Sequence, residues 1–213
     1  RKEMKRFRSI ITALAQGDWS RIVLFHSKMQ PELSGKSIAE ISEAKNVDVF
    51  DVLYDILLAE IDDLHSAMVV AFTYREEDIR LAFEHSSCMV GSDATALATD
   101  GPLQGTSFHG AYTWASWFYR HFVRDTSTFS PEEAVRRLTS LPARRLGMSD
   151  RGVIRRGAWA DLAVFDPLTF GECGTTFEPN QTAVGMIHVL VNGVLAMKDG
   201  AMTGTRSGQV LRS

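Results

Sequence analysis

The sequence has few cysteines, and this limits the covalent and metal chemistry it can support. Its 213 residues contain only Cys88 and Cys173, with no Cys-x-x-Cys pair, so no disulfide framework is predicted. A reducing, cytoplasmic compartment is the simplest interpretation. Both thiols are predicted to fill the core rather than to bind a metal.

The sequence also lacks the motifs of several other classes of protein. No apolar run approaches the roughly 18 residues of a membrane span, and the N-terminus has no signal-peptide core. The phosphate-binding, dinucleotide-binding and nucleophile-elbow glycine motifs are all absent. The net charge is -3, and the basic run at residues 1–8 is short and contains Glu3. We therefore predict no nucleic-acid partner and no membrane partner.

What is present is a chain with 45% hydrophobic and 23% charged residues, as in ordinary globular proteins. Its first third is predicted to be mainly helical. Ser37 and Glu40 have the spacing of a capping box, and a second helix is predicted to start at Asp48. Residues 22–25 are a strand candidate that precedes these helices.

The next segment predicts a strand, a helix and a strand. Residues 67–72 and 87–90 are apolar runs of strand length, and residues 76–85 between them have a helical pattern. This order is typical of a parallel βαβ unit, and the lack of alternation favours strands covered on both faces.

Asp93 follows the second of these strands, in the stretch Gly91-Ser92-Asp93. Because ligands gather at the carboxyl ends of parallel strands, Asp93 is a candidate metal ligand and general base. The alternative is an aspartate that caps the following loop or helix.

The six histidines form no His-x-His or His-Glu-x-x-His pattern, so the sequence predicts no self-contained metal site. His109 lies in the long loop after Asp93 and is a candidate contact in the same pocket. A hydrogen-bonded loop histidine without a functional role is the alternative. His85 and His188 are predicted to be structural.

A helix rich in aromatic residues is predicted over residues 111–123. Another is predicted to begin at Ser130 and Pro131, with Glu133 completing a capping box.

After Gly147 the pattern becomes that of strands, at residues 153–154, 161–165 and 187–197. Asn192-Gly193 is a strong signal for a tight hairpin turn. The chain is thus predicted to divide near residue 150.

Five stretches carry recognisable motifs: residues 89–93 (MVGSD), 134–146 (AVRRLTSLPARRL), 150–166 (DRGVIRRGAWADLAVFD), 191–193 (VNG) and the tail at 203–212. Together they resemble the amidohydrolase superfamily, in its N-acyl-D-amino-acid deacylase (D-aminoacylase) branch. The resemblance is close from about residue 66 onward. Residues 18–65 are similar to an insertion that this branch carries between late barrel strands.

The resemblance implies an α/β fold: the C-terminal part of a metal-dependent (β/α)8 (TIM) barrel at residues 1–150, then strands of a small β-sandwich at residues 151–213. It also implies hydrolysis of an amide by metal-activated water, with one or two zinc ions. Asp93 would be the metal-site carboxylate and general base, and His109 a substrate contact.

The other metal ligands of the family have no counterpart in this sequence. They are expected in an N-terminal segment of the same protein, so the chain alone would be inactive. The branch often has His-Pro-Arg where this chain has His109-Gly110-Ala111. The substrate therefore stays open among N-acyl-D-amino acids, other amides, cyclic amides and carbamoyl compounds.

A hypothesis of another class is a non-catalytic C-terminal subunit or binding module that retains the fold. The expected partners are a small-molecule amide, the N-terminal segment and, in a homo-oligomer, further copies of the chain.

Overall fold

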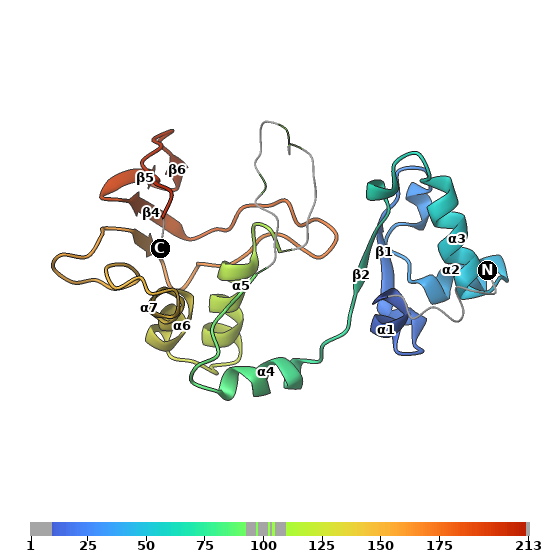
Figure 1. Cartoon of the computed structure of the whole chain (residues 1–213), viewed down its shortest axis with the longest axis horizontal. Helices are drawn as coiled ribbons and strands as arrows, with labels where there is room; N and C mark the ends of the chain where they lie inside the picture. The colour runs from blue at the N-terminus through green and yellow to red at the C-terminus, as the bar shows by residue number, and fades with distance from the viewer. Residues whose placement is uncertain (1–9, 93–96, 98–101, 103, 105–109, 212–213) are drawn as a thin grey trace. The chain divides into compact units, whose positions relative to one another are not determined.

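A computed structural model of the chain describes residues 10–92, 97, 102, 104 and 110–211. The chain divides into two compact units, Arg1–Leu81 and Ala82–Ser213, and each is described by itself (Figure 1). No helix within the described ranges is both long and apolar enough to cross a membrane.

The first unit is a small α/β structure with a two-stranded antiparallel sheet. Strands β1 (Ile22–His26) and β2 (Met68–Ala71) pair with Ile22 opposite Ala71. Helices α1 (Ile10–Ala15), α2 (Ile38–Lys45) and α3 (Val49–Ala59) complete it. Short 3-10 turns cover Trp19–Arg21, Pro31–Leu33 and Leu64–Ser66. The strands predicted at 22–25 and 67–72 are confirmed.

An aliphatic core holds this unit together. Side chains from β1, α2 and α3 are almost completely removed from solvent, which is the main stabilising contribution in a unit of this size. The buried members are Ala15, Ile22, Leu24, Leu33, Ile38, Ile41, Val52, Leu53 and Ile56.

Both predicted helix starts in this unit are confirmed. The Ser37 backbone N–H donates to Glu40 Oε2 at 2.7 Å, and the Glu40 N–H donates to Ser37 Oγ at 3.2 Å. The Asp48 carboxylate accepts the Phe50 N–H at 2.9 Å. These bonds satisfy backbone donors that a helix leaves free at its first turn.

The predicted parallel βαβ unit is wrong. Helix α4 (Glu76–Glu84) forms as expected, but β2 pairs antiparallel with β1, and residues 88–92 have no regular secondary structure. An apolar run indicates burial, whereas a strand also requires a neighbour with which to exchange backbone hydrogen bonds. Among the described strands, none forms a ladder with residues 87–90.

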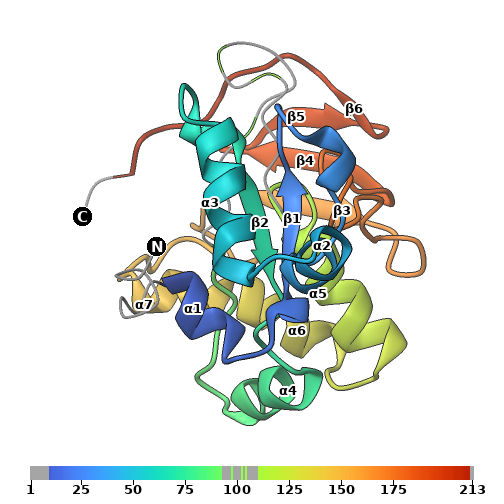
Figure 2. The same ribbon diagram turned by 90° about the vertical axis from the view of Figure 1, so that its right-hand side faces the viewer.

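The second unit combines helices with a four-stranded antiparallel sheet. Its helices are α5 (Trp114–Tyr119), the π-helix Arg120–Asp125, α6 (Pro131–Leu138) and α7 (Ser140–Arg145). The sheet has the order β3 (Leu162–Phe165), β4 (Met186–Val191), β5 (Val194–Lys198) and β6 (Ala201–Met202). Figure 2 shows β4, β5 and β6 side by side.

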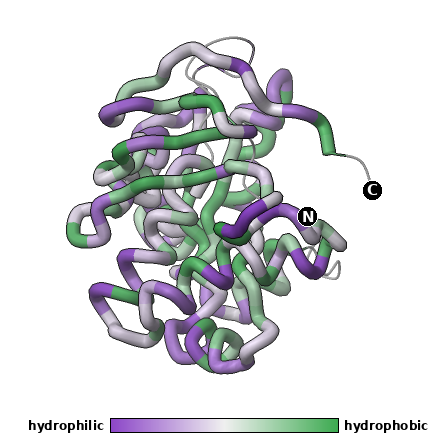
Figure 3. Tube along the Cα trace, turned by 90° about the vertical axis from the view of Figure 1, so that its left-hand side faces the viewer, coloured by the Kyte–Doolittle hydropathy of each residue, from purple (hydrophilic) through white to green (hydrophobic). Residues whose placement is uncertain are grey.

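Two sequence signals in the sheet have opposite outcomes. The Asn192-Gly193 hairpin is confirmed: both residues have positive φ, 50° and 80°, and Val191 pairs with Val194. The strand predicted at residues 153–154 is wrong, because this segment forms no ladder and Ile154 is 91% exposed. Hydrophobic residues dominate the strands of this sheet and polar residues its turns (Figure 3).

The second layer of the predicted β-sandwich is not among the described strands of this unit, which form one sheet. It stays a prediction.

The helix predicted at residue 130 forms but is divided in two. Ser130 accepts the Glu133 N–H at 3.3 Å, and Pro131 takes the first helical position. Thr139 then has φ -130° and ψ -84°, outside the helical range, which separates α6 from α7. The carboxylate of Glu133, expected to close a capping box, instead binds two arginines.

Candidate functional site

Asp93 and His109, the two candidate site residues, lie outside the described residues. The structure describes the chain on both sides of them. Residues 85–92 lead toward Asp93, and helix α5 begins five residues after His109.

A buried arginine holds the backbone that leads to Asp93. The Arg137 guanidinium donates to the carbonyl oxygens of Cys88 at 2.6 Å and His85 at 3.1 Å. The neighbouring Arg136 donates to the carbonyl oxygen of Ser86 at 2.8 Å. Three carbonyl groups of one short segment are thus bound by side chains of α6.

The acidic partner of both arginines is Glu133, one turn earlier on α6. Its carboxylate accepts from Arg136 Nε at 2.6 Å and from Arg137 Nε at 2.7 Å. The hydrogen bond from Arg136 makes the largest contribution and that from Arg137 a smaller one, and together they lower the pKa of Glu133 to about 2 against the opposing effect of burial. Glu133 is therefore ionised at neutral pH and is unsuited to act as a general acid.

An aromatic cluster lies beside this arginine. Phe83, Phe118, Phe122 and Phe129 contact one another with ring centroids 5.0 to 6.3 Å apart. The Arg137 guanidinium lies 4.5 Å from the centroid of Phe129. The aromatic-rich helix predicted over residues 111–123 thus forms as α5 and the π-helix that follows it, and its buried Phe118 and Phe122 are packing residues.

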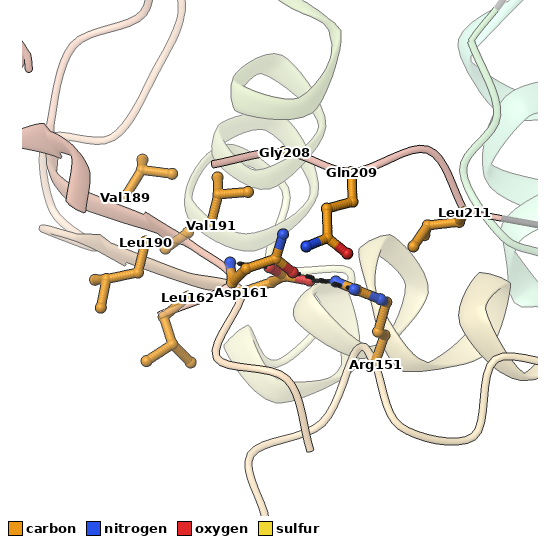
Figure 4. Close-up of a pocket in the computed structure, with 11 residues that line it drawn as sticks. Arg151, Asp161, Leu162, Val189, Leu190, Val191, Gly208, Gln209 and Leu211 are labelled. Atoms are coloured by element: carbon orange, nitrogen blue, oxygen red, sulfur yellow. Dashed lines mark hydrogen bonds and ion pairs between the residues drawn. The ribbon is translucent and has the colours of Figure 1, made fainter. Parts of the chain in front are cut away.

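The motif at residues 150–166 and the hairpin turn meet in one polar cluster (Figure 4). Arg151 forms an ion pair with Asp161, and Asp161 Oδ1 accepts the Asn192 N–H at 2.8 Å. Asn192 Oδ1 in turn accepts from Arg151 at 3.1 Å, and its amide nitrogen donates to the Ser207 carbonyl at 2.6 Å. These groups satisfy one another, so the motif fastens the sheet rather than presenting free catalytic groups.

Gly152 shows a second structural requirement of the same motif. Its φ is +74°, and an added Cβ would lie 2.9 Å from the Thr139 carbonyl oxygen and 3.0 Å from the Ala143 Cβ. Only glycine combines this φ with so close an approach to the α6–α7 junction.

The pockets among the described residues of the second unit include two that are mainly apolar. One, of about 320 Å³, borders the polar cluster and is lined mainly by Leu162, Leu190 and other apolar residues. The other, of about 610 Å³, lies among α5, α6 and β3 and is also mainly apolar, with Trp114, Tyr119 and Phe165 in its wall. Neither brings together a set of metal-ligating side chains.

The described residues by themselves do not fit a metal ion. Within residues 10–92 and 110–211 and the three single described positions, no three His, Cys, Asp or Glu side chains are placed to hold one. His188 has a structural contact instead, since its Nδ1 accepts the Asp199 N–H at 3.2 Å. Cys88 and Cys173 are free thiols; Cys173 is exposed, so its predicted place in the core is wrong.

Arg137 and Glu133 are the residues that sequence reasoning missed. Ala134 and Leu141 are buried, and Arg137 lies three residues after Ala134 and four residues before Leu141. A charged residue at a core-facing helical position signals a buried partner.

Comparison with known proteins identifies the family of this chain. The model of the "Amidohydrolase family" matches residues 79–196, more than half of the chain. An N-acyl-D-glutamate deacylase of Alcaligenes xylosoxydans xylosoxydans is 34% identical over 188 residues, covering 87% of this chain and 35% of the relative.

Solved structures give the same result. A D-aminoacylase mutant in complex with copper chloride superposes with a TM-score of 0.73 at 28% identity, over 91% of this chain and 38% of that one. A second similar structure is an N-acyl-D-glutamate deacylase from Bordetella bronchiseptica, complexed with zinc and a phosphonate inhibitor that mimics the tetrahedral intermediate. Its TM-score is 0.69 at 32% sequence identity, and the match covers 93% of this chain and 39% of that one. The chain thus spans little more than a third of the length of these relatives.

The expected α/β class is confirmed by these neighbours, which are amidohydrolases of a TIM-barrel family. With the family model, the sequence identity and the structural similarity in agreement, this chain belongs to the amidohydrolase family.

Proposed function

We propose that the full-length protein that carries this chain hydrolyses the amide C–N bond of a small molecule in a metal-dependent reaction. The observation that supports this most is the 32–34% identity to N-acyl-D-glutamate deacylases over nearly the whole chain. An N-acyl-D-amino acid is the first substrate class to test, followed by other amides, cyclic amides and carbamoyl compounds.

Asp93 is proposed as a metal-site carboxylate and general base, because it follows the segment at residues 88–92 in the order of the family motif. Its carboxylate would accept the proton of the attacking water. His109 is proposed to contact the substrate from the loop that follows. When bound, one or two zinc ions would make that water more acidic.

The remaining metal ligands are proposed to come from a segment outside this chain. The described residues supply no complete metal-binding group, and the relatives are nearly three times as long as the matched region. Residues 1–150 are proposed to belong to the barrel, with an insertion, and residues 151–213 to a small β-sandwich.

The test is to express the full-length gene product and measure hydrolysis of N-acyl-D-amino acids, other amides, cyclic amides and carbamoyl compounds, before and after treatment with a chelator. We expect hydrolysis that the chelator abolishes and added zinc restores. Hydrolysis that the chelator leaves unchanged would contradict the metal dependence. A stable protein that hydrolyses none of the four substrate classes would favour the non-catalytic binding module instead.

A further inference from the structure

Arg137 has an unusual environment for a charged side chain. Only 4% of the side chain is exposed, on a helix that is otherwise amphipathic. Burying a guanidinium is costly unless each donor finds a partner. Its partners are the Glu133 carboxylate at 2.7 Å and the carbonyl oxygens of His85 and Cys88 at 3.1 and 2.6 Å.

The segment that Arg137 holds is not fixed by strand pairing. Residues 88–92 form no ladder with any described strand. The carbonyl groups at residues 85, 86 and 88 are bound by the two arginines of α6 instead. These bonds take the place of the backbone pairing that fixes an ordinary strand.

Arg137 is itself fixed in place, which lets it serve as an anchor. Glu133 binds its Nε from one turn earlier on the same helix, and the Phe129 ring lies against the guanidinium plane at 4.5 Å. Phe83, just before the held segment, is 6.0 Å from the same guanidinium. A side chain held on three sides loses little further entropy when it binds the two carbonyls.

We propose that Arg137 is a positioning residue that fixes the backbone of residues 85–88 and so sets the course of the segment that leads to Asp93. The inference rests on the proposed role of Asp93 in amide hydrolysis. Asp93 lies five positions after Cys88 in the sequence, a span of at most about 18 Å, so a displaced anchor shifts the start of a short connection. Misplacement of a catalytic group by about 1 Å can cost about 100-fold in rate.

The geometry requires arginine rather than lysine. The guanidinium donates through Nε toward Glu133 and through Nη1 toward the two carbonyls, in one rigid plane. A lysine side chain is shorter and ends in a single ammonium group, so it can form some of these three hydrogen bonds but not all of them.

The experiment compares three variants of the full-length gene product. Arg137→Met removes the donors, and Arg137→Lys keeps the charge. Arg120→Met is the matched control, because it breaks another arginine–carboxylate pair of the same unit, with Glu172 at 2.9 Å, that touches none of residues 85–88. Measurements are kcat and KM separately, amide hydrogen exchange of residues 85–92, and the thermal midpoint.

We expect Arg137→Met to lower kcat about 10- to 100-fold with KM little changed, and to accelerate exchange in residues 85–92. Arg137→Lys should recover part of both effects, and it replaces the methionine variant if that variant does not fold. Arg120→Met should lower the thermal midpoint while it leaves kcat and exchange at 85–92 as in the wild type.

Wild-type kcat and exchange in Arg137→Met would overturn the proposal. An equal loss of kcat in Arg120→Met would also overturn it, because the effect would then follow general stability. If the wild type hydrolyses no amide, the proposed function fails, and the exchange measurement still decides whether Arg137 anchors the segment.

Discussion

The two units bury different kinds of side chain. Residues 10–81 enclose an aliphatic core built from β1, α2 and α3. Residues 82–211 rely on an aromatic cluster and on arginines that bind backbone carbonyls and carboxylates. Apolar burial is non-directional, whereas hydrogen-bonded arginines require defined geometry. The second unit therefore adds to its apolar packing a buried arginine, Arg137, whose contacts require defined geometry.

The family comparison divides the chain at nearly the same point. The amidohydrolase model begins at residue 79, and the second unit begins at Ala82. All the motifs that carry the resemblance lie in the second unit. The first unit contains all of the proposed insertion at residues 18–65, and its contribution to chemistry is expected to be smaller.

The largest expected effect concerns the chain by itself. Residues 1–213 expressed alone should bind no stoichiometric zinc and hydrolyse no amide, because a zinc site needs three or four protein ligands. Metal analysis, oligomeric state and thermal unfolding check this. A monomer with a sharp transition and one zinc per chain would contradict the proposed missing segment.

The next effect tests the chemistry assigned to the second unit. Asp93→Asn in the full-length gene product should lower kcat about 10²- to 10⁴-fold, since an amide cannot accept the proton of water. The fold, followed by circular dichroism, should be unchanged. Asp62→Asn, at an exposed position of the first unit, is the control and should remain fully active. Near wild-type turnover in Asp93→Asn would remove its proposed role.

The third effect tests the core of the first unit. Leu24 is completely buried, and Leu24→Ala should cost about 2–5 kcal/mol of unfolding free energy. The half-exposed Leu57 provides the control, for which Leu57→Ala should cost much less. Chemical denaturation measures both. Equal costs would show that this core does not stabilise the unit.

A smaller effect is expected from the proposed substrate contact. His109→Ala should raise KM about tenfold through loss of one hydrogen bond and leave the zinc content unchanged. His26→Ala, at an exposed end of β1, should change neither quantity. Lost zinc with an unaltered KM would instead make His109 a metal ligand.

The smallest effect is a pH dependence in the first unit. The Met29 N–H, Ser27 Oγ and Ser66 Oγ donate to Glu60 and lower its pKa from 4.5 to about 2. Because the folded pKa lies below the unfolded one, ionised Glu60 stabilises the unit above about pH 4.5, and this contribution is lost as the pH falls toward 2.

Glu60→Gln should therefore flatten the stability profile between pH 4.5 and 2. The exposed Glu43→Gln should leave the profile as it is in the wild type. Denaturation midpoints across this range check both variants, and parallel curves for wild type and Glu60→Gln would contradict the assignment.

The caps and the hairpin turn, which the sequence predicted correctly, are formed by residues that lie close together in the chain. The capping box of Ser37 and Glu40 spans one helical turn, and the Asn192-Gly193 turn needs only two residues that tolerate positive φ. Such local bonds form in any context that leaves the helix or hairpin intact, so their residue types identify them. The family resemblance depended on motifs of the same short range.

Tertiary structure decided what depends on distant partners. Residues 87–90 have the composition of a strand, yet strand formation requires a neighbour that composition does not specify. Arg137 binds carbonyls 49 and 52 residues away in the chain, which no local pattern reveals. The sequence by itself determined the caps, the hairpin and the family. The fold decided how strands pair and which groups bind the buried charges, because hydrogen bonds between residues far apart in the sequence depend on which segments meet in space.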